Sequence, residues 1–412
     1  MIGHTELAKR FGTPAYVYDL DRIAAAKRDL FAALPDEVDL FYAVKANPHP
    51  EIVREMLGGR GRRCRAEISS VGELAAVLKA GFPAAQVLYT GPGKTDAELS
   101  EALATGVRLF SVESLSDLLH IAAAAEALGV VADCLLRVNS ATTSGATSIR
   151  MTGVPSQFGF DSETLPTLAD DLLGVPGARV VGAHFFPLSS AQDEATLIAE
   201  FQHTLRAAAQ LQEQLGTAFE FLDIGGGFAA PYAVTGERPV YGALRAALAE
   251  SLDTYFPGWR QGSPRIACES GRYLVGDSGT LLVGVVNVKE SRGRRFVILD
   301  SGINSFGGMS GLGRILPTSV RPIESDGATE WVASLVGPLC TPGDVLGRDI
   351  KMPELGPGDV LTIPNAGAYG VTASLLMFLG RPAPLEYVMR GGDVVSASRI
   401  RHVRDYEYGQ EQ

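Results

Sequence analysis

The chain has 412 residues, of which 46% are hydrophobic and 20% charged, which is enough to bury a sizeable core and to form two domains. Its net charge of −11 and its lack of Lys/Arg blocks argue against nucleic acid or an anionic membrane as the main partner. Its most apolar long stretch, residues 118–136, carries charged residues that exclude a membrane span.

The N-terminus has no basic stretch leading into an apolar core, so we expect no secretory signal and a cytoplasmic protein. The four cysteines are too few for a disulfide framework and lack the paired spacing of metal ligands, so no metal site is predicted. We expect Cys64, Cys134 and Cys268 to be buried thiols.

Short β-rich runs alternate with helical patterns through the first two thirds of the chain. The helical patterns include residues 70–81, 114–129 and 195–216, with apolar residues at three- and four-residue spacing and glycines near their ends. About eight β/α units in this length predict a (β/α)8 barrel. The expected strands are residues 39–45, 63–68, 86–90, 107–112, 133–138, 179–186, 219–224 and 265–270.

The pattern changes after residue 270. Runs rich in β-branched residues follow one another without helices of barrel length, and Gly, Pro and Asp separate them. We expect a mostly antiparallel β domain at 271–412, a barrel at 28–270, and an N-terminal segment at 1–27 whose strand joins the β domain.

Reactive side chains lie at the predicted strand ends. In a barrel of this kind the chemistry gathers at the carboxyl ends of the strands, so these side chains should share one mouth. Lys45 alone, in "FYAVKANPHP", could be an ordinary surface lysine, but the other strand ends carry partners for it. They are Glu67, Arg137, His184, Glu269 and the glycine turn Gly225, Gly226 and Gly227 in "DIGGGF".

These residues together suggest pyridoxal 5'-phosphate (PLP). Its aldehyde requires a lysine, its phosphate requires donors, and its ring nitrogen requires a carboxylate. Lys45 would bond the aldehyde carbon and Glu269 would hold the ring nitrogen. The glycine turn and Arg272 would bind the phosphate, because glycine backbone can approach an anion closely and a guanidinium suits a dianion.

The motifs resemble the fold-type III PLP-dependent decarboxylases of the ornithine/diaminopimelate decarboxylase family. The matching stretches are "FYAVKAN", "EISSVGEL", "GPGKT", "DIGGGF", "ESGRYLV", "GPLCTPGD" and "NAGAYG", in the family's order over residues 41 to 370. "GVPSQFGFD", "GPLCTP" and "GAYG" look most like a smaller branch typified by the butirosin-pathway decarboxylase, which acts on an amino acid held as a thioester on an acyl carrier protein.

The resemblance implies a role for each matching residue. Lys45 would carry the cofactor, with Glu67 near it and His184 stacked on the ring. Cys340 would return a proton after carbon dioxide leaves, a role that suits a thiol near a cationic cofactor; the alternative is a buried structural cysteine. The family usually forms a homodimer in which "GPLCTPGD" enters the neighbour's barrel. The remaining cofactor residues would be Arg137, Gly225, Gly226, Gly227, Glu269, Gly271, Arg272 and Tyr369.

The chain departs from the family at the substrate end. Decarboxylases of free diamino acids generally follow the cysteine with Asp or Glu, whereas Thr341 stands here, so a distal ammonium would lose a charge-assisted bond of roughly 1.5–3 kcal/mol. Gln157 replaces the family's lysine in "SKFG", and Leu188 to Ser190 replace the usual glycine after the stacking histidine. The expected substrate-binding residues are Thr341, Asp344 and Arg314.

We therefore expect decarboxylation of an L-amino acid that is tethered to a carrier or otherwise conjugated, of glutamyl or aspartyl type, in a secondary-metabolite biosynthetic pathway. Alternatives are a free diamino acid decarboxylase, an amino-acid racemase, which would need a second base, and a non-catalytic homologue that binds a partner. Carrier proteins are acidic, so docking would need a local basic patch, drawn from Arg60, Arg62, Arg63 or Arg314.

Overall fold

The computed structural model describes residues 4–58, 61–141, 149–150, 155–191, 193–307 and 330–404. The chain divides into two compact units. One comprises Arg22–Ala230 and Glu237–Val275, and the other Met1–Asp21, Pro231–Gly236 and Gly276–Gln412. The domain boundaries expected after residues 27 and 270 stay a prediction.

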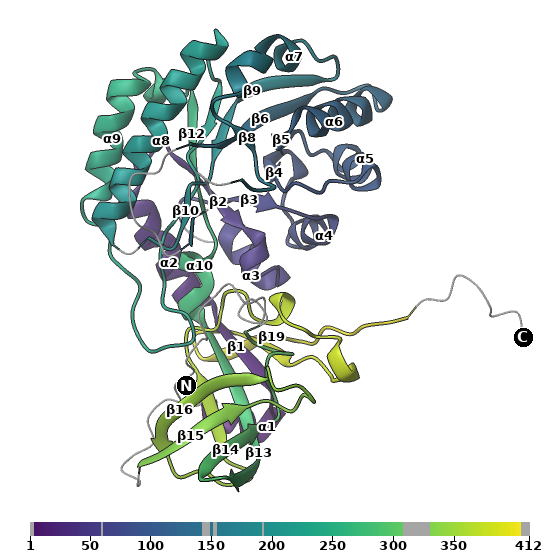
Figure 1. The fold of residues 1–412 in the computed structure, drawn as a ribbon, viewed down its shortest axis with the longest axis vertical. Coiled ribbons are helices and arrows are strands. Elements are labelled where there is room, and N and C mark those ends of the chain that lie inside the picture. The colour runs from purple at the N-terminus through teal and green to yellow at the C-terminus, as the bar shows by residue number, and fades with distance from the viewer. Residues whose placement is uncertain are drawn as a thin grey trace, which may run out of the picture. The chain divides into compact units, whose positions relative to one another are not determined.

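The first unit is a closed barrel of eight parallel strands, as predicted from the alternating pattern (Figure 1). Each strand pairs in parallel with the next, and the last pairs with the first. The barrel strands are β2 (Asp39–Ala43), β3 (Arg65–Ile68), β4 (Val87–Tyr89), β5 (Leu109–Val112), β6 (Ala132–Asn139), β9 (Ala178–Phe185), β11 (Phe221–Asp223) and β12 (Arg265–Ser270).

Apolar side chains from several barrel strands fill the barrel's interior. One cluster of buried residues takes one residue from each of six strands: Phe41, Leu88, Leu135, Val181, Phe221 and Ala267. Because this interior is packed with apolar side chains, polar chemistry is confined to the strand ends and the loops that follow them.

Helices surround the barrel strands in Figure 1. Their N-termini carry side-chain caps where the sequence offers them, since Ser70, Thr95, Ser114 and Asp193 each accept a backbone N–H of the first turn. The helices are α2 (Leu20–Ala33), α3 (Pro50–Leu57), α4 (Val71–Lys79), α5 (Asp96–Thr105), α6 (Leu115–Ala127), α7 (Ala169–Leu173), α8 (Glu194–Leu215), α9 (Leu244–Tyr255) and α10 (Arg272–Val275).

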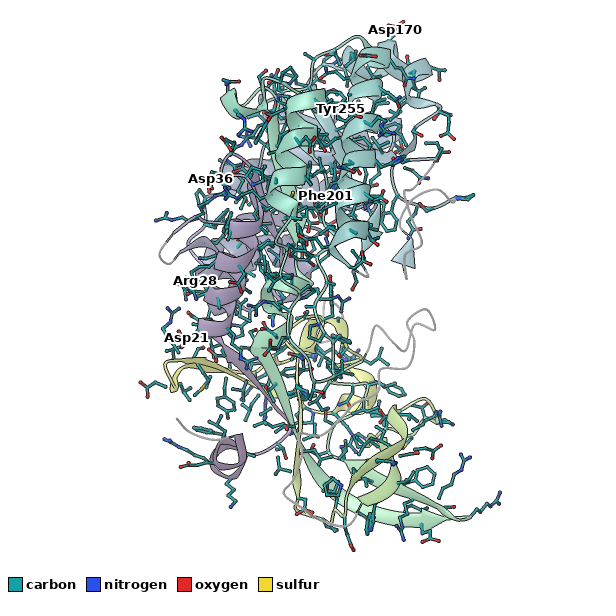
Figure 2. The ribbon with its side chains drawn as sticks, turned by 90° about the vertical axis from the view of Figure 1, so that its left-hand side faces the viewer. Asp21, Arg28, Asp36, Asp170, Phe201 and Tyr255 are labelled. Carbon is teal, nitrogen blue, oxygen red and sulfur yellow. The ribbon has the colours of Figure 1, made fainter. Side chains whose placement is uncertain are left out.

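The two longest C-terminal barrel helices, α8 and α9, pack on each other. Figure 2 labels Phe201 on the first and Tyr255 on the second. Arg206 of α8 donates a hydrogen bond to the Tyr255 hydroxyl at 3.1 Å. Within the part of the chain that the structure describes, no helix has both the length and the hydropathy to cross a membrane.

The second unit contains an eight-stranded, mostly antiparallel sheet, as expected. The N-terminal strand β1 lies between an antiparallel and a parallel partner from the C-terminal part, β13 and β18, which confirms that it joins the β domain. The unit comprises α1 (His4–Phe11), β1 (Ala15–Asp19), β13 (Gly279–Ser291), β14 (Arg294–Leu299), β15 (Glu330–Val336), β16 (Val345–Pro353), β17 (Val360–Ile363), β18 (Leu385–Arg390) and β19 (Asp393–Ser398).

The cysteines follow the expectation for buried thiols. Cys64, Cys134 and Cys268 are buried and unpaired, whereas Cys340 is exposed. Within the single chain, Cys340 thus differs from the other three thiols, and its role stays a prediction.

Candidate active site

A cavity of about 360 Å³ lies at the carboxyl ends of the barrel strands. Five predicted site residues line it together: Lys45, Glu67, Arg137, His184 and Glu269. They come from β3, β6, β9, β12 and the short turn Val44–Ala46 after β2. The parallel register brings these strand ends side by side, because Glu269 pairs with Phe41 and Arg137 with His184. The other residues that line the cavity are Ser69, Thr90, Gly91, Pro92, Gly93, Lys94, Phe158 and Phe186.

Lys45 and Glu67 form an ion pair in the cavity. The Lys45 Nζ atom lies 2.6 Å from Glu67 Oε2 and 2.8 Å from Oε1. The lysine side chain is 39% exposed but the glutamate side chain only 1%, so the ammonium faces the cavity while the carboxylate lies in the wall. The Thr90 and Ser69 hydroxyls also donate to Glu67 Oε1. Glu67 is thus held firmly and fixes the direction of Lys45.

A second carboxyl group stands behind this pair. Glu73, in the first turn of α4, accepts the Ser69 N–H at 2.7 Å. Burial and the nearby charge of Glu67 raise the pKa of Glu73 to about 7, although the Ser69 N–H and Lys45 oppose the rise. A carboxyl group with a pKa near neutral pH therefore contacts the cavity-lining residue Ser69.

His184 and Glu269 face each other in the floor of the cavity. His184 Nδ1 is hydrogen-bonded to Ser111 Oγ at 2.7 Å, which orients the ring. Its Nε2 lies 3.2 Å from Glu269 Oε1, yet both atoms are buried without a hydrogen-bond partner. Burial raises the pKa of Glu269, but the combined effect of His184, Lys45 and Arg137 is larger and opposite. The pKa of Glu269 therefore lies below its usual value. Glu269 is therefore a charged carboxylate beside His184, and its Oε1 makes no hydrogen bond of good geometry.

Asp223 is a buried neighbour that the sequence analysis did not single out. Its Oδ1 accepts the Gly225 N–H at 2.9 Å, while its Oδ2 has no partner. Burial and the charge of Glu269 raise its pKa well above the usual value. One carboxylate oxygen of Asp223, one ring nitrogen of His184 and one carboxylate oxygen of Glu269 lie within 4.8 Å of one another. Imidazole and carboxylate groups are also the side-chain types that bind metal ions. The place of Asp223 two residues before the glycine turn in "DIGGGF" was the signal available.

The glycine turn packs so tightly that side chains are excluded. Gly225 and Gly227 have φ angles of +75° and +115°, and a Cβ on Gly226 would lie 2.3 Å from the Glu269 carbonyl oxygen. Gly271 is similarly close to the Lys45 turn, because its Cβ would meet Ala46 Cβ at 2.8 Å. Bare backbone therefore surrounds this edge of the site, and Arg272 follows at the start of α10.

Arg137 forms one side of the cavity. Its Nη1 donates to Glu113 Oε1 at 3.2 Å, and Glu113 Oε2 accepts the Gly159 N–H at 2.7 Å. The guanidinium lies 4.9 Å from the centre of the Phe158 ring and 5.9 Å from that of Phe186. Ion pairing and stacking together orient Arg137 toward the cavity.

Lys94 is a second wall residue to which the sequence analysis gave no role. Its Nζ donates to Asp117 Oδ2 and to the Gly91 carbonyl oxygen, both at 2.7 Å, and its side chain is 1% exposed. This buried pair fixes the loop of residues 91–94 that closes one side of the cavity. The quoted motif "GPGKT" contained it, but its partner Asp117 is 23 residues away.

The other predicted residues belong to the β unit. Cys340 lies on the turn after β15, with Thr341 half-buried and Asp344 buried on the same turn. Tyr369 has a φ of +52° and its carbonyl oxygen accepts a hydrogen bond from the Tyr232 hydroxyl at 3.3 Å. Arg314, the third expected substrate residue, lies outside the described residues.

The proposed basic docking patch is corrected by the barrel geometry. Arg62 and Arg63 precede the N-terminal end of β3, whereas the cavity lies at the carboxyl ends of the strands. Arg62 also donates to the carbonyl oxygens of Pro35 and Val38 and stacks on Phe31 at 4.4 Å. These two arginines are at the wrong end of the barrel, and Arg60 lies outside the described residues.

The cavity fits PLP. A lysine faces it, the buried Glu269 Oε1 and His184 Nε2 lack hydrogen-bond partners, and the neighbouring turn has space only for glycine backbone. An aldehyde, a protonated ring nitrogen and a phosphate would meet these three features in turn.

Comparisons with known proteins also indicate a barrel that binds PLP. A family profile described as "Pyridoxal-dependent decarboxylase, pyridoxal binding domain" matches residues 20–276. The chain is 32% identical to the L-glutamyl-(BtrI acyl-carrier protein) decarboxylase of Niallia circulans, over 94% of this chain and 91% of the relative. It is 34% identical to the diaminopimelate decarboxylase of Methanothermobacter thermautotrophicus, over 94% and 89%.

A solved structure is similar over almost the whole chain. The Helicobacter pylori diaminopimelate decarboxylase complexed with L-lysine has a TM-score of 0.81 at 27% identity, covering 97% of this chain and 96% of that chain. The chain therefore belongs to the pyridoxal-dependent decarboxylase family and is a PLP-dependent decarboxylase with a barrel of fold type III.

Proposed function

We propose that the enzyme decarboxylates a glutamyl or aspartyl group held as a thioester on an acyl carrier protein, in the cytoplasm and within a biosynthetic pathway. Two observations support this substrate class. The Niallia circulans relative is named for a glutamyl carrier-protein substrate. The turn that follows β15 offers no free carboxylate among its described residues 337–344.

The missing carboxylate is the observation that carries the substrate argument. Thr341 follows Cys340, and its hydroxyl already accepts the Gly343 N–H at 3.3 Å. Asp344, the acidic residue of this turn, is 3% exposed, and each of its oxygens accepts a backbone N–H. A distal ammonium would find no charged acceptor here, which disfavours lysine, ornithine and diaminopimelate.

The barrel residues would bind the cofactor and hold it in place. When bound, PLP supplies the electron sink that stabilises the negative charge left on Cα as carbon dioxide leaves. Lys45 would bond the aldehyde carbon, with Glu67 orienting its Nζ. Glu269 would accept a hydrogen bond from the protonated ring nitrogen, and His184, oriented by Ser111, would pack on the ring.

Phosphate binding would use backbone and cationic groups. The turn Gly225, Gly226 and Gly227 would provide close backbone approach, and Arg272 a guanidinium. We assign the Tyr369 side chain to the same phosphate, with Arg137 and Gly271 beside the cofactor. The Thr341 and Arg314 side chains would contact the substrate.

Cys340 would finish the reaction. Its S–H bond breaks as a C–H bond forms at Cα, and the thiolate then takes a proton from solvent. Cys340 is exposed in the single chain. We propose a homodimer in which the cysteine turn of one protomer completes the barrel site of its partner, as the family resemblance implies.

The test is carbon dioxide release from a panel of substrates. Free lysine, ornithine, diaminopimelate, glutamate and aspartate would be compared with glutamyl and aspartyl thioesters on a carrier protein. We expect release from a thioester only. Release from a free diamino acid would overturn the substrate class and favour the activity for which the diaminopimelate relatives are named.

The same panel separates the remaining alternatives. A racemase would exchange the Cα proton and form the D-amino acid without releasing carbon dioxide. A non-catalytic homologue would do neither, although it would bind the carrier. Normal amine release from a thioester excludes both.

A further inference from the structure

Asp344 is buried in the β unit and joins two segments that are far apart in sequence. Its Oδ1 accepts the Ile303 N–H at 2.8 Å, and its Oδ2 accepts the Leu339 N–H at 2.7 Å. Both bonds are short enough for charge-assisted hydrogen bonds to a carboxylate. Leu339 immediately precedes Cys340, so one of the two bonds holds the peptide next to the proposed acid.

Two glycines make room for this carboxylate. A Cβ on Gly302 would lie 2.0 Å from Asp344 Oδ1, and one on Gly337 would lie 2.3 Å from Oδ2. The backbone closes the same turn, because the Gly337 N–H donates to the Asp344 carbonyl oxygen at 3.0 Å. The carboxylate therefore occupies a slot in which positions 302 and 337 have space only for glycine.

We propose that Asp344 is a positioning residue for Cys340 and not a substrate contact. This inference rests on the proposed function, in which Cys340 gives its proton to Cα. The thiol must reach one atom from one direction, and a displacement of about 1 Å can cost on the order of 100-fold in rate. Asp344 fixes the turn at its base, so that Cys340 points in one direction. The assignment replaces the substrate role expected from the sequence.

The proposal is tested with two kinds of variant that disturb the same contact. Asp344→Asn keeps the size of the side chain but turns one acceptor into a donor that faces an N–H. Gly337→Ala keeps the carboxylate but pushes it aside. The controls are Asp349→Asn, which removes a charge from an exposed position, and Gly356→Ala, whose Cβ would have no heavy atom within 4 Å.

Two readouts distinguish positioning from general stability. The first is the ratio of aldehyde to amine among the products that the holoenzyme forms. An aldehyde forms when the proton goes to the cofactor instead of Cα; the amino group then stays with the cofactor, and water supplies the carbonyl oxygen. The second is hydrogen–deuterium exchange of the peptides that contain Ile303 and Leu339.

We expect both test variants to raise the aldehyde fraction about tenfold or more, with faster exchange at the two peptides and with bound PLP unchanged. The controls should match the wild type. A loss of bound PLP and of carbon dioxide release together, at a constant aldehyde fraction, would show a merely structural role and overturn the proposal.

Cys340→Ala separates failure of this inference from failure of the proposed function. If Cys340→Ala itself keeps the normal amine yield, the acid role of Cys340 is wrong. If Cys340→Ala diverts products but Asp344→Asn and Gly337→Ala do not, Cys340 keeps its role and only the positioning role of Asp344 is refuted.

Discussion

Lys45 Nζ lies between the two carboxylate oxygens of Glu67, at 2.6 and 2.8 Å. The pair joins the turn after β2 to the end of β3, and Glu67 is itself held by Thr90 and Ser69. The buried carboxylate of Glu67 therefore sets the direction in which the Lys45 ammonium faces the cavity.

Lys45→Ala should abolish covalent attachment of the cofactor and lower kcat by at least about 10²–10⁴-fold, because Lys45 both bonds the aldehyde and is positioned to move protons. Reduction with borohydride followed by peptide mass analysis should label Lys45 in the wild type. The exposed Lys79→Ala serves as control. A yellow, fully active Lys45→Ala protein would contradict the assignment.

Glu269→Gln should lower kcat by about 10²–10³-fold, since an amide cannot replace the charge of a carboxylate at the ring nitrogen. His184, Lys45 and Arg137 hold the pKa of Glu269 below its usual value, so the wild-type group stays ionised at neutral pH. Glu250→Gln on the exposed side of α9 is the matched control. Equal rates of carbon dioxide release in all three proteins would exclude the role.

Gly226→Ala should weaken PLP binding about tenfold or more, because the new Cβ would lie 2.3 Å from the Glu269 carbonyl oxygen and overpacking costs roughly 1–3 kcal/mol. Gly242→Ala has open space around its Cβ and should bind normally. Titration of the apoproteins with PLP, followed by visible absorbance, gives both affinities. Identical affinities would argue against a tight cofactor cradle at this turn.

Glu386 should make the β unit less stable as the pH rises. Burial raises its pKa from 4.5 to about 7, although the Tyr18 hydroxyl donates to it at 3.2 Å. Between these values the folded form keeps a proton that the unfolded form has lost, so stability falls with rising pH and the full cost, roughly 3 kcal/mol, is reached above about pH 7.

Glu386→Gln should therefore gain stability at about pH 8.5 and much less near pH 5, as measured by calorimetry of the holoenzyme. Glu354→Gln, at an exposed position of the same unit, should show no such pH dependence. An equal effect of Glu386→Gln at both pH values would mean that the buried carboxyl is not protonated as expected.

Subunit mixing tests the shared site. Lys45→Ala and Cys340→Ala chains are each deficient, but a mixed dimer would contain one site with both residues intact. Random exchange of equal amounts should restore about one quarter of the wild-type amine release. Persistent inactivity after confirmed exchange would contradict a site built from two chains.

The sequence alone determined the barrel and the members of its mouth. Alternating β and α patterns predict parallel strands, and parallel strands place their carboxyl ends on one edge. Lys45, Glu67, Arg137, His184 and Glu269 could therefore be grouped without coordinates, because each stands at the end of a local pattern. The β-rich runs after residue 270 similarly predicted the second sheet.

Only the tertiary structure decided what each of these side chains touches. Ser111 orients His184 from 73 positions away, and Asp344 binds the N–H of Ile303, so neither contact follows from local periodicity. Arg62 appears in the sequence close to Glu67 but precedes the N-terminal end of β3, whereas Glu67 lies near its carboxyl end. Hydrogen-bond partners and burial depend on strand register and loop closure, which join distant residues through space, whereas the pattern along the chain records only the neighbours of each residue.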